Sequence, residues 1–182
     1  AQQIEPGLVE ETMWQQIIIG EPFGGSSARA ESLVKLLTAA GCAAVSSSDV
    51  RSEIWYKLWG NMTMNPVSAL TGATIDQILE DPLVRAFCSA AMREAAEVGA
   101  RIGCPIEQTP EDRHEVTAKL GAFKTSMLQD VEAGRQLELD AIVTAVHEIA
   151  RRLDLTTPNI DALLGLTRLF GRMRGLYSRG EN

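Results

Sequence analysis

The stretch DVRSEIWYKLWGNMTMNP, residues 49–66, constrains the fold of this chain more than any other. Asp49 is a favourable residue to precede a helix, because its carboxylate can accept hydrogen bonds from the free amides of the first turn. Large apolar residues then recur every three or four positions, namely Trp55, Leu58, Trp59 and Met62. Because this spacing is typical of one buried helical face, we predict a helix that buries the stripe in a core.

A second, polar row runs beside that stripe. Lys57, Asn61 and Asn65 are each four residues apart and so lie on one side of the predicted helix. Asparagine is unfavourable inside a helix, because its side chain competes for backbone hydrogen bonds. Pro66 has no amide hydrogen, so we expect the helix to end or kink there and to expose Asn65 to a cleft. The spacing alone allows either a substrate site or a solvated helix edge.

Composition excludes several classes of partner. The 182 residues are 45% hydrophobic and 23% charged, which suits a globular protein with a sizeable core. The net charge of −7 and the lack of a basic run argue against nucleic-acid binding. Apolar runs such as Ile17–Ile19 are far shorter than the roughly 20 residues of a membrane span, so we expect no membrane segment.

The chain order predicts a short β-α-β unit followed by helices. We expect a loop over 1–12, a strand within 13–25, a helix over 26–41 and a strand over Cys42–Val45. The segment after Pro66 continues the helical pattern and should break at Gly72. Further helices are predicted over 82–103, about 111–133, 137–155 and 160–176, with 179–182 as a disordered tail. The fold class is therefore mainly α.

Cysteines and histidines do not suggest a metal site. Cys42, Cys88 and Cys104 lack the spacing of a zinc site or a disulfide framework, so we expect reduced and mostly buried thiols in a cytoplasmic protein. His114 and His147 lie on different predicted helices, without a suitably spaced carboxylate or thiol. We predict that both histidines lie on the surface and that the chain holds no metal.

Two separated motifs resemble one enzyme family. The pattern K-x-x-x-N-x-x-x-N-P is formed by Lys57, Asn61, Asn65 and Pro66, and SMLQDVEAGRQLELDAI follows at 126–142. In this order they are similar to the two signatures of the ketopantoate reductase (2-dehydropantoate 2-reductase) family. The resemblance covers about residues 13–175. It implies a helical domain of the 6-phosphogluconate-dehydrogenase-like type, preceded by part of a Rossmann-type nucleotide-binding domain.

The resemblance also implies a reaction and a set of site residues. NADPH would reduce 2-dehydropantoate to pantoate for pantothenate synthesis, with Lys57 as the general acid. Asn61, Asn65 and Ser126 would bind the keto acid. Glu138 would also belong to the active site, where it could orient Lys57, accept a hydrogen bond from a substrate hydroxyl or contact the cofactor. We expect partial burial against Trp55 and Trp59 to help Lys57 give up its proton.

The expected division is 1–48 as a remnant of the nucleotide-binding domain, 49–178 as the catalytic helical domain and 179–182 as the tail. The phosphate-binding fingerprint G-x-G-x-x-G is absent from the sequence. We therefore expect a C-terminal portion of a longer enzyme, inactive alone, with NADPH bound mainly by the missing part. Unpaired edges of the two predicted strands favour a homodimer.

Other assignments stay open at this point. Asp130 and Asp140 are interpreted as structural, one as a helix-surface charge and the other as a possible partner for Arg135. One alternative is a related 2-keto acid reductase or β-hydroxyacid dehydrogenase with the same K-x-x-x-N element. The other is a helical oligomerisation module without catalysis, in which the lysine row would pack against another subunit.

Overall fold

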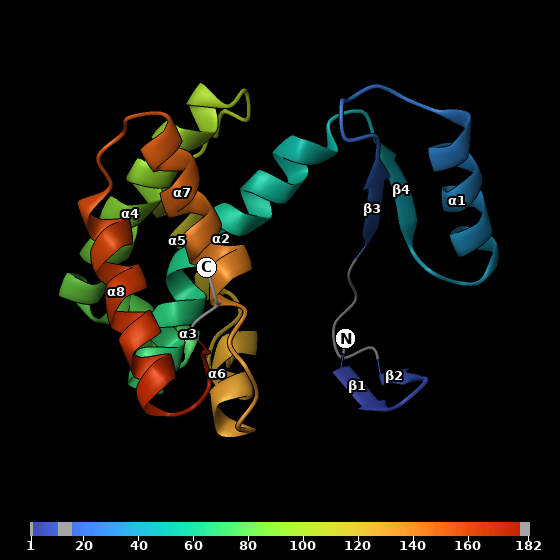
Figure 1. The fold of residues 1–182 in the computed structure, drawn as a ribbon. Coiled ribbons are helices and arrows are strands. Elements are labelled where there is room, and N and C mark those ends of the chain that lie inside the picture. The colour runs from blue at the N-terminus through green and yellow to red at the C-terminus, as the bar shows by residue number, and fades with distance from the viewer. Residues whose placement is uncertain (1, 11–15, 179–182) are drawn as a thin grey trace. The chain divides into compact units, whose positions relative to one another are not determined.

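The computed structural model of the chain describes residues 2–10 and 16–178 (Figure 1). Its contacts form two compact units, residues 1–54 and 55–182. The prediction of a mainly α chain is confirmed, because helices account for most of the described residues after position 49. Among the described helices, none is both long and apolar enough to cross a membrane.

The first unit contains two small sheets. Strands β1 (Gln2–Glu5) and β2 (Leu8–Glu10) form an antiparallel hairpin around Pro6 and Gly7. The prediction of a loop over 1–12 is therefore wrong for residues 2–5 and 8–10, which form these strands. Pro-Gly is a turn signal that can also join two strands, and the three or four residues on either side are too few to show a strand pattern.

The predicted β-α-β unit is confirmed, with shifted boundaries. Strand β3 (Ile17–Gly20) pairs in parallel with β4 (Ala44–Ser47), and helix α1 (Ala28–Ala39) connects them. Ser27 caps α1, since its hydroxyl accepts a hydrogen bond from the amide of Ala30 at 3.2 Å. Residues 13–15 of the predicted strand segment lie outside the described residues.

Helix α2 (Val50–Thr71) begins after Asp49, whose carboxylate accepts a hydrogen bond from the amide of Ser52 at 3.2 Å. The helix does not end at Pro66 but continues to Thr71, and the predicted break at Gly72 is confirmed by a φ of +74°. Residues 62–69 are all buried. Packing along this whole segment offsets the hydrogen bond that proline removes, which costs roughly 3 kcal/mol in an exposed helix.

The remaining helices follow α2 in the second unit (Figure 1). They are α3 (Ile75–Glu80), α4 (Pro82–Arg101), α5 (Pro110–Ala118), α6 (Ser126–Glu132), the π-helix η1 (Asp140–Thr144), α7 (Ala145–Arg152) and α8 (Pro158–Met173). The single helix predicted over 111–133 is wrong, because α5 and α6 are separated by a turn at Gly121, where φ is +60°. The helix predicted from residue 137 begins near Asp140 instead.

The apolar stripe of α2 lies in the main core. Trp59 and Met62 are fully buried, and Trp55 is 5% exposed. The indole Nε1 of Trp59 donates a hydrogen bond to the carbonyl of Met92 on α4 at 2.7 Å. Gly99 lets α4 approach closely, since a Cβ atom there would lie 2.1 Å from the indole nitrogen of Trp55. The predicted buried stripe is thus confirmed, and it fixes which face of α2 is left for the polar row.

Candidate functional site

The polar row on α2 runs from the surface into the interior. Lys57 is exposed, Asn61 is half-buried, and Asn65 is only 6% exposed. Eight residues of α-helix rise by about 12 Å, so the row spans a length suited to a small molecule. The side chains of Lys57 and Asn61 have no hydrogen-bond or ion-pair partner within the part of the chain that the structure describes. The partial burial expected for Lys57 is wrong, because both tryptophans turn into the core.

The second motif meets the buried end of this row. Ser126 is the first residue of α6, and the amide Nδ2 of Asn65 donates a hydrogen bond to its Oγ over 3.4 Å. The two residues are 61 positions apart in the sequence. An asparagine side chain offers two donor hydrogens and an acceptor oxygen, so this single long hydrogen bond leaves capacity for a ligand.

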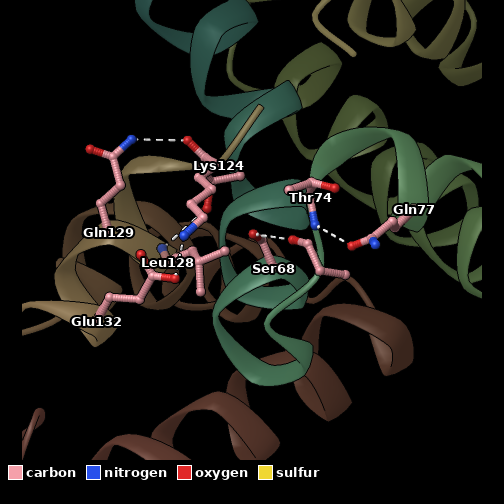
Figure 2. A network of polar contacts seen from close by, with 9 residues as sticks. Ser68, Thr74, Gln77, Lys124, Leu128, Gln129 and Glu132 are labelled. Carbon is pink, nitrogen blue, oxygen red and sulfur yellow. Dashed lines mark hydrogen bonds and ion pairs between the residues drawn. The ribbon is translucent and has the colours of Figure 1, made fainter. Parts of the chain in front are cut away.

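Local hydrogen bonds hold the start of α6 in place. The buried Thr125 caps the helix, because its Oγ1 accepts a hydrogen bond from the amide of Leu128 at 3.2 Å. Lys124 forms an ion pair with Glu132 at 2.7 Å, and Gln129 donates to the carbonyl of Lys124 at 3.0 Å (Figure 2). Ser126 is therefore presented on a helix end whose position is fixed by its neighbours, and it is itself exposed.

The end of α2 is fixed in the same way. Ser68 donates to the carbonyl of Ala73 at 2.7 Å, and the amide of Thr74 donates to the side chain of Gln77 at 3.0 Å (Figure 2). The amide of Ile75 also donates to the carbonyl of Phe123 at 3.0 Å. This backbone hydrogen bond ties the turn after α2 to the segment before α6, so Asn65 and Ser126 sit on two connected supports.

Glu138 lies in the irregular segment 135–138, directly before the helical turn that leads into η1, rather than on a helix. Its neighbours Leu137 and Leu139 are buried while Glu138 is exposed, and Leu139 already has helical backbone angles. The amide of Leu137 donates to the carbonyl of Leu176 at 2.8 Å, which holds this segment against the end of the chain. No ion pair joins Glu138 to Lys57 among the described residues, so their contact stays a prediction.

Sequence reasoning missed the anchor of the neighbouring π-helix. The carboxylate of Asp140 accepts hydrogen bonds from the hydroxyl of Tyr177 at 2.7 Å and from Thr144 at 3.0 Å. Burial, together with the hydrogen bond to Asp140, raises the pKa of Tyr177. Of the two aspartates, Asp130 is the partner of Arg135, whose guanidinium binds its carboxylate at 2.8 Å. Contacts between positions 140 and 177 leave no local signal in a sequence.

The expectation of two surface histidines is wrong for His114. This side chain is 5% exposed, and burial lowers its pKa. His147 is half-buried, and its Nδ1 lies 2.7 Å from the carboxylate of Asp161. The expected burial of the thiols holds for Cys88 and Cys104, whereas Cys42 is exposed. The sequence of α5 has little apolar periodicity, and its Val116 is exposed, so it gives no clear signal that His114 turns inward.

Comparison with known proteins gives consistent results. The family model described as "Ketopantoate reductase PanE/ApbA C terminal" matches residues 49–170. The chain is 43% identical over 173 residues to the 2-dehydropantoate 2-reductase of Mesorhizobium japonicum, covering 95% of this chain and 53% of that protein. The chain thus spans about half the length of the curated relatives it matches.

Two solved structures share the fold. A protein from Ralstonia solanacearum MolK2, provisionally named a ketopantoate reductase, superimposes with a TM-score of 0.91 at 54% identity, covering 96% of this chain and 53% of the other. The 2-dehydropantoate 2-reductase of Methylococcus capsulatus gives a TM-score of 0.80 at 28% identity, covering 90% of this chain and 52% of the other.

Proposed function

This chain belongs to the ketopantoate reductase family, and we propose that it supplies the substrate-binding and proton-donating residues for reduction of a 2-keto acid. The proposed substrate is 2-dehydropantoate, and the product is pantoate. The observation that supports this most directly is the hydrogen bond between Asn65 and Ser126, because it joins the two family motifs at one place. The relatives named 2-dehydropantoate 2-reductase support the choice of substrate.

Lys57 is the proposed proton donor. Reduction adds hydride to the keto carbon, so the electrons of the carbonyl double bond move onto its oxygen. An ammonium group at that oxygen stabilises the negative charge and delivers the proton. The exposure of Lys57 allows its amine to regain a proton from solvent after each turnover.

The amides and the serine are the proposed substrate ligands. Asn61 and Asn65 can donate to the carboxylate or carbonyl oxygens of a keto acid, and the Ser126 hydroxyl can donate as well. Glu138 is proposed to accept a hydrogen bond from the substrate hydroxyl or to orient Lys57. The row on α2 would then contact the carboxylate and the adjacent keto group together, with the long side chain of Lys57 reaching to the keto oxygen.

A nicotinamide cofactor, proposed to be NADPH, would supply the hydride. The residues of this chain do not form its usual phosphate cradle, since the sequence has no G-x-G-x-x-G and the loop after β3 reads GEPFGGSS. We therefore assign the described residues to the substrate side of the reaction. A contact of Glu138 with the cofactor belongs to this proposal as a secondary role.

We also propose that this chain forms a homodimer. Within the described residues, β3 and β4 pair only with each other, so each has an outer edge with free backbone groups. Such edges favour pairing with another chain. Light scattering at high concentration tests this, and a monodisperse monomer would contradict it.

Two measurements test the proposed function. Calorimetric titration of this chain with 2-dehydropantoate should show binding that Asn65→Ala weakens. NADPH oxidation by the whole protein should be fastest with 2-dehydropantoate among a panel of 2-keto acids. Turnover of a different keto acid would keep the residue roles and correct the substrate. Absence of both binding and turnover would favour an oligomerisation module instead.

A further inference from the structure

The chain reverses direction at the end of α8. The amide of Leu176 donates a hydrogen bond to the carbonyl of Gly171 at 2.8 Å. The amide of Gly175 donates to the carbonyl of Arg172 at 3.2 Å. This pair of hydrogen bonds, with Gly175 at a φ of +70°, is the Schellman motif that ends many helices. The turn brings the residues that follow α8 back against the segment that contains Glu138.

Two hydrogen bonds fix the backbone just before Glu138. The side-chain amide of Gln136 donates to the carbonyl of Gly175 at 3.1 Å. The backbone amide of Leu137 donates to the carbonyl of Leu176 at 2.8 Å. Leu137 and Leu176 are each 6% exposed and belong to the main core. Apolar packing therefore stabilises this contact in addition to the hydrogen bond.

A third contact fixes the chain just after Glu138. Leu139 is fully buried, and Asp140 begins the π-helix η1. The carboxylate of Asp140 accepts hydrogen bonds from the hydroxyls of Tyr177 at 2.7 Å and Thr144 at 3.0 Å. Burial raises the pKa of Tyr177, and so does its hydrogen bond to Asp140, so the hydroxyl remains a donor at neutral pH. Glu138 is thus held on both sides by the segment that follows α8.

The π-helix makes the course of the chain at this point depend on Asp140. The amide of Ala145 donates to the carbonyl of Asp140, five residues earlier, instead of taking the four-residue step of an α-helix. Such turns are rare, which indicates that they need tertiary contacts to persist. The hydrogen bond from Tyr177 is such a contact, because it holds the first residue of the turn. We expect its loss to let the turn relax and to move Glu138, which lies two residues earlier.

We propose that Tyr177, acting through Asp140, positions Glu138 in the keto acid site. This positioning role rests on the active-site role proposed above for Glu138. Glu138 is exposed and has no hydrogen-bond or ion-pair partner within the described residues, so its carboxylate is available to the substrate or to Lys57. Because a displacement of about 1 Å can slow a reaction strongly, a backbone fixed on both sides favours the reaction by keeping this carboxylate in place.

Removal of the hydroxyl alone tests the proposal. Tyr177→Phe removes the donor but keeps the ring, whose centre lies 5.9 Å from the guanidinium carbon of Arg172. The assay uses the whole protein, NADPH and the 2-keto acid of the panel that is reduced fastest. The variant should lower kcat about tenfold and change KM less than about twofold, because the substrate ligands on α2 remain in place. In a Glu138→Ala background the same substitution should leave kcat unchanged, since no carboxylate is left to position.

Variants of Asp140 and a matched control separate positioning from stability. Asp140→Asn keeps an acceptor oxygen for Tyr177 and should retain most of the wild-type kcat, whereas Asp140→Leu should match Tyr177→Phe. Thr157→Val removes another hydrogen bond from a hydroxyl to a carboxylate, which joins Thr157 to Asp161 at 3.0 Å at the start of α8. This control should lower the free energy of unfolding without lowering kcat.

Hydrogen exchange of this chain tests the same contact without turnover. Protection of the backbone amides of residues 137–140 should fall in Tyr177→Phe, because the contact that holds η1 is lost. In Thr157→Val the protection of these amides should equal that of the wild type. Unchanged protection in Tyr177→Phe would overturn the proposal, whatever the activity of the whole protein.

The kinetic outcomes distinguish the positioning role from the proposed function. Absence of turnover with every acid of the panel would overturn the reductase proposal and this role with it. An unchanged kcat in Glu138→Ala would show that Glu138 has no active-site role to be positioned for. If Glu138→Ala lowers kcat but Tyr177→Phe does not, only the positioning role is wrong. The same conclusion follows if Tyr177→Phe lowers kcat equally in both backgrounds.

Discussion

Two buried polar side chains of the helical unit, Asn65 and His114, differ in whether they have a hydrogen-bond partner. At the end of the α2 row, Asn65 is 6% exposed and has a partner in Ser126. On α5, His114 is 5% exposed and its ring nitrogens have no partner among the described residues. Burial of a polar group therefore does not by itself reveal a role. The presence or absence of a hydrogen-bond partner distinguishes the two cases.

The largest effect is expected for Lys57→Ala, which tests whether the polar row on α2 takes part in catalysis. Lys57→Ala should lower the kcat of the whole protein with 2-dehydropantoate by about 100-fold or more, the usual contribution of a general acid. Because Lys57 is exposed, the free energy of unfolding should change by less than about 0.5 kcal/mol. Lys119→Ala, another exposed lysine, is the matched control and should change neither quantity. A fully active Lys57→Ala enzyme would contradict the catalytic role proposed for the polar row on α2.

Asn65→Ala tests the buried end of the same row. The variant should raise KM about tenfold or more, because it removes a hydrogen bond to a charged substrate group that is worth roughly 1.5–3 kcal/mol. Asn159→Ala is an informative control, since that amide binds Glu94 at 2.6 Å away from the site. It should lower stability without changing KM. Equal effects of both variants on KM would show that Asn65 acts only through the fold.

The pH dependence of stability tests the burial of His114. Its pKa is lowered in the folded state from an ordinary value of 6.5, so the unfolded chain binds more protons. The stability that His114 contributes is present above pH 6.5 and is lost as pH falls toward the folded pKa, with a slope of at most about 1.4 kcal/mol per pH unit. Denaturation curves of the wild type and His114→Gln should diverge in this window. If the stabilities of the two proteins changed in parallel with pH, the pKa of His114 would be the same in the folded and unfolded states.

The smallest expected effect concerns the contact between the two motifs. A double-mutant cycle of Asn65→Ala and Ser126→Ala should give a coupling free energy of about 0.5 kcal/mol in the absence of substrate, because a 3.4 Å hydrogen bond is long. With bound 2-dehydropantoate the coupling should grow if both side chains hold the same ligand. Zero coupling with and without substrate would mean that Asn65 and Ser126 act independently.

Local sequence patterns determined much of the secondary structure and part of the core. Three- and four-residue spacing placed Trp55, Trp59 and Met62 in the core, and local signals located the start of α2 after Asp49 and its end at Gly72. The β-α-β unit followed from the same kind of signal. These predictions succeeded because helix registers, caps and glycine turns depend on neighbours within a few residues.

Only tertiary structure decided the rest. Helix α2 continues through Pro66 because distant segments bury residues 62–69, whereas proline by itself favours an end. The burial of His114, the position of the segment before η1 and the Asp140–Tyr177 hydrogen bond depend on segments that are far apart in the sequence. The sequence by itself determined which side chains share the face of α2. Packing alone decided how deeply each of these side chains is buried. It also decided that Asn65 contacts Ser126 of the second motif.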